Sequence, residues 1–194
     1  MYHKHHTKGL ILESWGEGDH SLRVKVLTEN FGLISARVQG ARLASSKLKS
    51  GCQQFSLGNF SFVKGKTGWK IVSALPEKNY FEILKNSPEK LIVMGNVLNL
   101  SKKLLSGEEK DEKVFSAIVN FLSLLEKTPG AMVPILEGIS LMRILHILGY
   151  MKADPDLLAP VSASEIVMSD LETIAPRRAR IVSLINESLK ASQI

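Results

Sequence analysis

The chain has 194 residues, 44% hydrophobic and 23% charged, so it can bury a core as one large domain or two small ones and is not disordered. The formal net charge is +6, and residues 1–80 carry 12 Lys and Arg against 5 Asp and Glu. This concentration of charge indicates a polyanion-binding half or, as the alternative, a merely basic soluble domain. The single cysteine, Cys52, excludes an intramolecular disulfide and a cysteine-based zinc cluster.

Five short segments of the first half have the two-residue alternation of β-strands. They are Lys8–Trp15, Ser21–Thr28, Leu33–Gln39, Phe55–Lys64 and Trp69–Leu75. In the second segment, Leu22, Val24 and Val26 share one face. Arg23 and Lys25 share the opposite face. Glycine-marked turns separate the segments, and five strands this close together predict a small closed β-barrel.

The connection between the third and fourth predicted strands is unusual in composition. Residues 39–51 read QGARLASSKLKSG, with small residues, three cations and no acid. Such a stretch is typical of a solvated loop. It is also suited to a flexible clamp for a negatively charged ligand.

The second half has the spacing of helices. Ser87-Pro88-Glu89 is a strong helix start, with a capping serine, a proline in the first turn and an acid. Further helices are predicted over residues 114–125, over residues 131–148 with Gly149 as the C-cap, and from Ala175-Pro176 onward. We therefore predict an α+β protein of two domains, a barrel over residues 1–78 and an α-helical bundle over residues 79–194.

Targeting signals are not evident. Residues 1–9 are polar and lack the apolar core of a signal peptide. The most apolar stretch, residues 131–148, is interrupted by Glu137, Arg143 and His146, which favours a buried helix over a membrane span. Together with the lone cysteine, which fits a reducing compartment, these features lead us to expect a cytoplasmic protein without membrane contact.

Enzyme and metal motifs are scarce. There is no phosphate-binding loop with its lysine, no G-x-S-x-G and no H-E-x-x-H. Glu17 and Asp19 could bind a cation, but a Gly-Glu-Gly-Asp run is typical of a hairpin turn. His3, His5 and His6 could ligate a metal, but chain ends are usually loose. We expect no enzyme activity, no cofactor and no metal.

The basic first half supplies the candidate nucleic-acid-binding residues, nine cations and one aromatic side chain. They are Arg23, Lys25, Arg37, Arg42, Lys47, Lys49, Lys64, Lys66, Trp69 and Lys70. Small barrels commonly bind single strands with a basic groove and stacking aromatics. Trp69, beside Lys70 and just past a turn, is the stacking candidate, whereas Phe60 and Phe62 are assigned to the core. The alternative is a solvated barrel face.

A second basic cluster begins the last predicted helix. Arg177, Arg178 and Arg180 lie where cations oppose the helix macrodipole, at a cost of a few tenths of a kcal/mol each. An unfavourable position favours a role such as binding an acidic peptide or a phosphate. An ordinary group of exposed arginines is the competing interpretation.

The order of these motifs resembles the bacterial recombination mediator family RecO. The matching motifs of the first half are Gly9-Leu10-Ile11-Leu12, Trp15-Gly16-Glu17-Gly18-Asp19, Leu27-Thr28, Phe31-Gly32, Gly40-Ala41-Arg42, Ser46-Lys47-Leu48-Lys49 and Gln53-Gln54-Phe55. Those of the helical half are Glu137, Leu141, Arg143, Ile144, Leu145 and Leu148-Gly149-Tyr150. Many family members carry a four-cysteine zinc module after the Gly-Tyr pair. Met151–Ser164 has no cysteine, so a reduced insertion without zinc is expected here.

The resemblance implies an N-terminal OB-fold barrel, a C-terminal helical domain and a nucleoid-associated role in the cytoplasm. It implies binding of single- and double-stranded DNA, strand annealing, and loading of recombinase during DNA repair. The implied partners are the single-stranded-DNA-binding protein, through its acidic C-terminal tail, and RecR. The residues by themselves support a barrel and a polyanion, and leave open an RNA-binding OB-fold protein or a protein-interaction scaffold without nucleic-acid binding.

Overall fold

The computed structural model describes residues 3–105, 107–151, 154–163 and 165–191. The chain forms two compact units. The barrel unit comprises Met1–Ile83 with Leu105–Glu112, and the helical unit comprises Leu84–Leu104 with Lys113–Ile194. The sequence predicted a single domain boundary after residue 78. The structure shows that a later segment, Leu105–Glu112, groups with the barrel unit because its backbone packs against the turn at Gly32.

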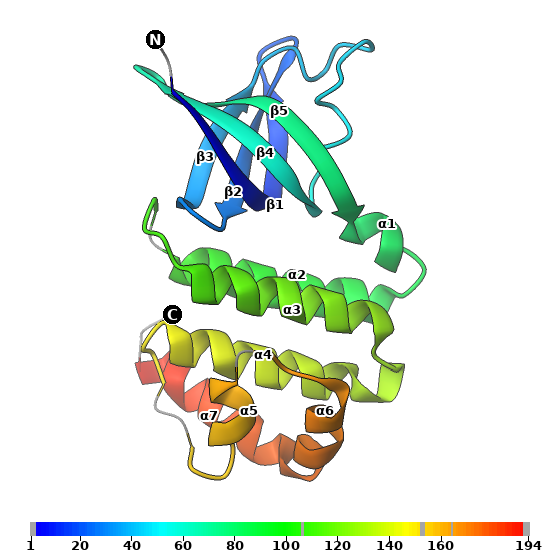
Figure 1. Ribbon diagram of the computed structural model, residues 1–194. Coiled ribbons are helices and arrows are strands. Elements are labelled where there is room, and N and C mark those ends of the chain that lie inside the picture. The colour runs from blue at the N-terminus through cyan, green and yellow to red at the C-terminus, as the bar shows by residue number, and fades with distance from the viewer. Residues whose placement is uncertain (1–2, 106, 152–153, 164, 192–194) are drawn as a thin grey trace. The chain divides into compact units, whose positions relative to one another are not determined.

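Five strands form the barrel unit: β1 (Lys4–Glu17), β2 (Ser21–Thr28), β3 (Gly32–Val38), β4 (Ser56–Gly65) and β5 (Gly68–Asn79). Their hydrogen-bonded order is β1-β2-β3-β5-β4, closing on β1 (Figure 1). All pairings are antiparallel except the short β3–β5 pairing, which closes the ring through Ala36↔Trp69 and Arg37↔Lys70. The five predicted strands are thus confirmed, with small shifts at their ends.

The barrel interior is filled by alternate residues of the strands. Val24 and Val26 of β2, with Ile34, Ala36 and Val38 of β3, are at most 1% exposed. The two phenylalanines of β4 that the sequence assigned to the core are also buried. The intervening polar residues face outward, so the strand periodicity alone separates core from surface here.

The first strand begins earlier than predicted. β1 starts at Lys4, and His5 and His6 pair with Phe62 and Ser61 of β4. The expectation of a loose histidine-bearing end was therefore wrong for these two residues. The His6 ring Nδ1 lies 2.9 Å from the Ser61 hydroxyl, and the His5 ring packs edge-on against other aromatic rings of the barrel. Pairing along β4 orders this segment.

The helices are α1 (Tyr80–Leu84), α2 (Pro88–Leu104), α3 (Glu112–Lys127), α4 (Val133–Ile147), α5 (Leu158–Ser162), α6 (Met168–Ile174) and α7 (Arg178–Ala191). Short 3-10 turns, Gly130–Met132 and Ala175–Arg177, precede α4 and α7. The predicted start at Ser87 is confirmed, because its carbonyl accepts the Lys90 and Leu91 amides. Gly149 has a φ of 78° after α4, as a C-cap requires. The sequence did not predict α1, α5 and α6, which are shorter than a periodic pattern can reveal.

Helix α4 is the central element of the helical unit, in contact with α2, α5, α6 and α7. It is buried on nearly all sides, as its composition predicted. Gly130–Ile147 is apolar and long enough to cross a membrane by length and composition, but half of it is buried inside the structure. It also carries Arg143, whose Nη1 donates a hydrogen bond to Asn120 Oδ1 of α3 at 3.1 Å. We interpret it as the core helix of this unit.

Candidate nucleic-acid interface

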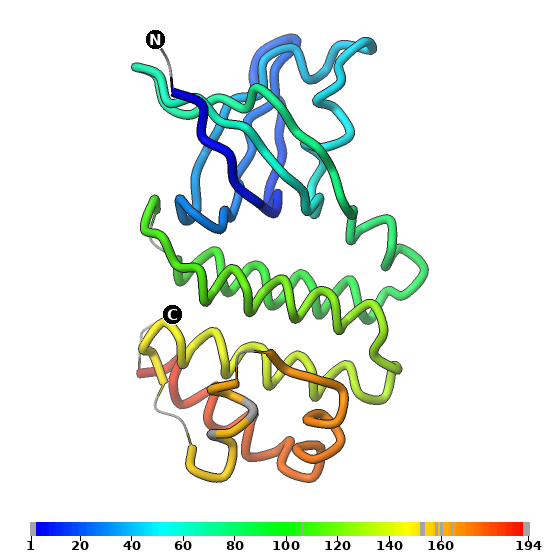
Figure 2. Tube along the Cα trace, viewed as in Figure 1, coloured from blue at the N-terminus to red at the C-terminus, as the bar shows by residue number. Residues whose placement is uncertain are grey.

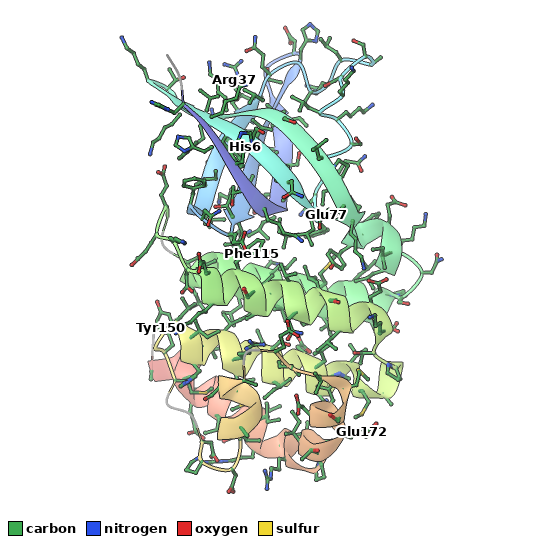
Figure 3. The ribbon with its side chains drawn as sticks, viewed as in Figure 1. His6, Arg37, Glu77, Phe115, Tyr150 and Glu172 are labelled. Carbon is green, nitrogen blue, oxygen red and sulfur yellow. The ribbon has the colours of Figure 1, made fainter. Side chains whose placement is uncertain are left out.

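Four outward-facing side chains lie at paired positions on four neighbouring strands of the barrel. Trp15 of β1 pairs with Arg23 of β2, Arg23 with Arg37 of β3, and Arg37 with Lys70 of β5. Neighbouring strands lie about 4.8 Å apart, so these side chains form a continuous line across four strands. Arg37, labelled in Figure 3, belongs to this line. We call Trp15, Arg23, Arg37 and Lys70 the outer row.

One carboxylate is shared by two arginines of the outer row. Arg23 donates from Nε to Glu17 Oε1 at 2.9 Å, and Arg37 Nε lies 3.4 Å from Glu17 Oε2. The second contact is an ion pair without hydrogen-bond geometry. Beside the row, Lys25 lies 3.3 Å from Glu13. The row carries three positive charges and Glu17 carries one negative charge, so the row keeps a local excess of positive charge. Glu17 orients the arginines without neutralising the row.

Trp15 was not predicted as a binding residue, yet it is the aromatic side chain that the outer row presents. It is 40% exposed, in contrast to the buried residues that precede it in β1. The sequence contains a signal for this position. Trp15 alternates with Glu13 and Glu17, so it shares their solvent-facing side of the strand. An exposed indole in line with three cations is suited to stacking on an unpaired base.

Trp69 is not available as a stacking platform, so the prediction for this residue was wrong. It is 6% exposed and packs against Phe31, Phe62 and His5, with ring centroids 5.4–6.1 Å away. The reason is strand alternation, because Trp69 has the parity of the interior residue Ile71 and Lys70 points the other way. The prediction relied on the neighbouring Lys70 in the sequence and therefore assigned Trp69 to the outer face of the strand, whereas Trp69 lies on the inner face.

Lys64 is engaged by the segment that joins α2 to α3. Its Nζ lies 5.0 Å from the Trp69 ring centroid and 2.6 Å from Glu108 Oε2. The Trp69 indole donates to Glu108 Oε1 at 3.0 Å. The hydrogen bond from Lys64 lowers the pKa of the Glu108 carboxyl below its usual value, burial opposes this shift, and the Trp69 hydrogen bond adds to it. Lys64 thus contributes less to a phosphate track than the sequence predicted.

The loop between β3 and β4, whose course Figure 2 shows, is a chain of hydrogen-bonded turns. Arg42 fixes it to the β1–β2 turn, since its amide donates to His20 O and its Nη1 to Gly18 O, both at 3.0 Å. At the other end, the Gln54 side chain donates to Leu12 O at 3.1 Å. Lys47 and Lys49 are exposed and form no ion pair with the residues that the structure describes. The loop holds its cations in an ordered arrangement.

Lys66 and Lys70, at the β4–β5 hairpin, are also exposed. Within the described ranges neither has a carboxylate partner. The structure therefore divides the predicted cations into two groups. Arg23, Lys25, Arg37 and Lys64 have acidic partners, whereas Arg42, Lys47, Lys49, Lys66 and Lys70 do not within the described part of the chain.

The arginine cluster of the helical unit is partly committed to internal contacts. Arg177 donates from Nη1 to the Asp156 carbonyl, and Arg180 donates to Asp154 Oδ2 at 3.0 and 3.2 Å. These bonds hold the loop before α5 and offset the unfavourable position of the cations near a helix start. Arg178 has no partner among the residues with described positions. Of the predicted three, it alone retains an uncommitted guanidinium by this criterion.

No group of three or more His, Cys, Asp or Glu side chains that could hold a metal ion occurs among the described residues. The segment expected to be a reduced insertion contains α5 and the loop before it, and residues 152, 153 and 164 lie outside the described residues. Cys52 is fully buried in the barrel unit, where burial raises the pKa of its thiol to about 12.

The chain thus has the architecture of a two-unit protein. A small closed β-barrel with a basic outer row is followed in the chain by an all-helical unit. Residues 1–76 match the family described as Recombination protein O N terminal. The chain is also similar to several proteins named DNA repair protein RecO. The resemblance to the RecO family is thus confirmed, at modest identity, by the match of the first 76 residues and by these relatives.

Three of these relatives illustrate the extent of the match. The protein of Acetivibrio thermocellus is 24% identical, covering 74% of this chain and 57% of its own length. That of Alkaliphilus metalliredigens is 23% identical, covering 82% and 63%. That of Caldicellulosiruptor bescii is 31% identical, covering 62% and 49%. The chain therefore spans about half to two thirds of the length of these relatives.

Proposed function

We propose that this chain is a non-enzymatic, cytoplasmic DNA-binding factor of DNA repair and homologous recombination. Its barrel is assigned to the OB-fold class and binds single- and double-stranded DNA through the outer row, with Lys47 and Lys66 as flanking phosphate contacts. The observation that carries the proposal is the outer row itself, one exposed indole and three cations in line across four strands. The names of the relatives supply the DNA repair context.

The mechanism follows from the chemistry of the row. Lysine and arginine side chains hold phosphates of one or two strands and release their counterions, while the Trp15 ring stacks on a base. By offsetting the repulsion between phosphates, the same surface brings complementary strands together and promotes annealing. None of these contacts reads a base edge, so binding is tolerant of sequence.

Further partners belong to the same proposal. An acidic C-terminal tail of the single-stranded-DNA-binding protein meets Arg178 at the start of α7, and RecR completes the assembly that loads recombinase. Arg178 is chosen because Arg177 and Arg180 already contact Asp156 and Asp154. A titration with an acidic peptide tests it, with Arg178→Glu expected to abolish binding. Equal affinity of the variant and the wild type would remove this part of the proposal.

The DNA-binding proposal is tested by fluorescence anisotropy with a labelled single strand and its duplex between about 50 and 200 mM salt, where phosphate contacts cost affinity steeply. Lys70→Ala is expected to weaken binding and to reduce the logarithmic salt slope by about 0.7 on the single strand. Lys190→Ala in α7 is the matched control, because it removes an exposed cation of the helical unit. A flat salt dependence in the wild type contradicts the proposal.

Competition between DNA and RNA oligonucleotides of the same sequence separates DNA repair from RNA binding. The outer row has no feature that selects the 2′-hydroxyl, so the proposal expects RNA to compete no better than DNA. Strong preference for RNA favours an RNA-binding OB-fold protein. Absence of binding to either favours a protein-interaction scaffold.

A further inference from the structure

The barrel unit has a depression at the end where the β3–β4 loop meets the β1–β2 hairpin. Its volume is about 300 Å³. It is lined by Ser14 of β1, Leu22 of β2 and, from the loop, Ala41, Arg42, Lys49, Cys52 and Gln53. Barrel mouths are common places for small ligands, and this volume is at the lower end of the range for small-molecule sites. We call this depression the mouth pocket.

The charge of the mouth pocket favours an anion. Its lining includes Arg42 and Lys49 and no carboxylate. The bond from Arg42 Nη1 to Gly18 O fixes the guanidinium at the rim and uses one of its five N–H donors. Lys49 has no ion-pair partner within the ranges that the structure describes. Two cations therefore converge on one small cavity with donors to spare.

The rest of the lining suits a flat, partly apolar group. Ala41 and Cys52 are fully buried, and Leu22 packs against the same core cluster. Because burial raises the pKa of the Cys52 thiol to about 12, the side chain stays uncharged and supports the pocket from beneath as part of the apolar core. Ser14 and Gln53 add neutral hydrogen-bonding groups. Cations beside an apolar floor with neutral donors and acceptors match a phosphate joined to a heterocyclic base.

The mouth pocket adjoins the outer row. Ser14 precedes Trp15 in β1, and Leu22 precedes Arg23 in β2. Since successive strand residues point to opposite faces, the row and the pocket are served by the same two strand segments, on their outer and inner sides. The outer row and the mouth pocket thus lie on opposite faces of the same strand segments, close to the β1–β2 turn.

We propose that the mouth pocket holds one unpaired nucleotide of a bound single strand, with its phosphate at Arg42 and Lys49 and its base against Leu22, above the buried Ala41 and Cys52. This inference rests on the proposed DNA-binding function and adds a specificity to it. A nucleotide in a duplex cannot enter, because its base is paired and stacked. The outer row serves both forms of DNA, and the mouth pocket distinguishes single strands from duplexes.

The first test uses the full chain, labelled with nitrogen-15, and NMR titration with deoxythymidine monophosphate, thymidine and inorganic phosphate as separate probes. The monophosphate is expected to shift the amides of residues 41–53 and of Gly16 and Gly18 at lower concentration than either fragment. Inorganic phosphate binding as tightly as the nucleotide overturns the proposal in favour of a simple anion site. Absence of shifts with the nucleotide also overturns it.

The second test measures the ratio of single-strand to duplex affinity in loop variants. Lys49→Ala is expected to weaken single-strand binding about fivefold, the upper range for an exposed charge contact, and to change duplex binding less than twofold. Lys47→Ala is the matched control, since Lys47 lies in the same loop but not in the pocket lining; as a flanking phosphate contact it should weaken both DNA forms alike and leave their affinity ratio unchanged. Arg42→Ala should act like Lys49→Ala, with thermal unfolding measured alongside because Arg42 also fixes the loop.

The outcomes separate this inference from the function on which it rests. Wild-type binding to both DNA forms, weakened by Lys70→Ala but with an unchanged affinity ratio in Lys49→Ala, removes the mouth pocket and keeps the DNA-binding function. Wild type that binds no DNA removes the function, and the strand-holding role of the pocket falls with it even if the mononucleotide binds.

Discussion

The barrel unit and the helical unit both contain arginines, and the core arginine of the helical unit serves the opposite purpose to the two on the barrel strands. In the barrel unit, Arg23 and Arg37 stand on the outside of the strands and share one carboxylate. In the helical unit, Arg143 is 4% exposed and bonds to Asn120 inside the core. Side-chain position thus decides whether a cation is offered to a partner or organises the fold, and the total charge of each half does not.

The largest expected effect is on the buried arginine of the helical unit. Arg143→Ala should destabilise that unit by about 3 kcal/mol, because it empties a packed site and breaks a buried polar network. Asn120 connects this network to the segment before α6, accepting the Ile166 amide at 2.9 Å and donating to the Ile166 carbonyl at 3.1 Å. Denaturant unfolding followed by circular dichroism measures the loss.

The control for Arg143 is Arg180, whose side chain is 57% exposed and paired with Asp154. Arg180→Ala should cost about 1 kcal/mol, less than Arg143→Ala, because the arginine itself is exposed although its partner Asp154 is mostly buried. Neither variant should alter the DNA affinity of the folded protein. A DNA-binding defect in Arg143→Ala under conditions where it is fully folded breaks the proposed contrast between the two units.

The second prediction compares the two tryptophans of the barrel unit. Trp15→Ala should cost about 1–3 kcal/mol of single-strand binding, the usual value of one stacked base, and leave the unfolding midpoint nearly unchanged. Trp69→Phe should lower the unfolding midpoint and leave single-strand binding nearly unchanged, because it loses the indole hydrogen bond to Glu108 and leaves the outer row intact. Anisotropy and thermal unfolding of both variants measure the pair. If Trp69→Phe weakens DNA binding more than Trp15→Ala, the assignment of the outer row fails.

The smallest expected effect concerns Glu108, whose carboxyl pKa is lowered mainly by the Lys64 hydrogen bond. A group with a lowered folded-state pKa stabilises the fold above its unfolded pKa of about 4.3 and loses this contribution as pH falls through the folded value. The Glu108 side chain is half exposed, so solvent screening reduces the contribution to a few tenths of a kcal/mol.

Glu108→Gln should therefore be slightly less stable than the wild type at neutral pH, with the difference vanishing as the pH falls below about 4. Glu109→Gln is the control from the same segment, and it should show no such convergence because the side-chain hydrogen bonds of Lys64 and Trp69 go to Glu108. Unfolding midpoints across this pH range measure the effect. A difference that grows on acidification contradicts the sign.

Much of the fold was predictable because its signals are local. The alternation in β2 and β3 separated core from surface residue by residue, and Ser87 and Gly149 marked helix ends through capping chemistry. The site was predicted less well. The cations were identified as a group, but Trp69 was chosen over Trp15 because proximity to a lysine was given more weight than strand parity.

The sequence alone determined the strand and helix periods, the two-part organisation and the basic character of the first half, since these depend on residue spacing and composition. The tertiary structure decided which cations are free and which are paired. Glu17 meets Arg37 only because β1, β2 and β3 are in register, and Glu108 meets Lys64 only because a segment far along the chain packs against the barrel. Such contacts join residues distant in sequence, and no local pattern encodes them.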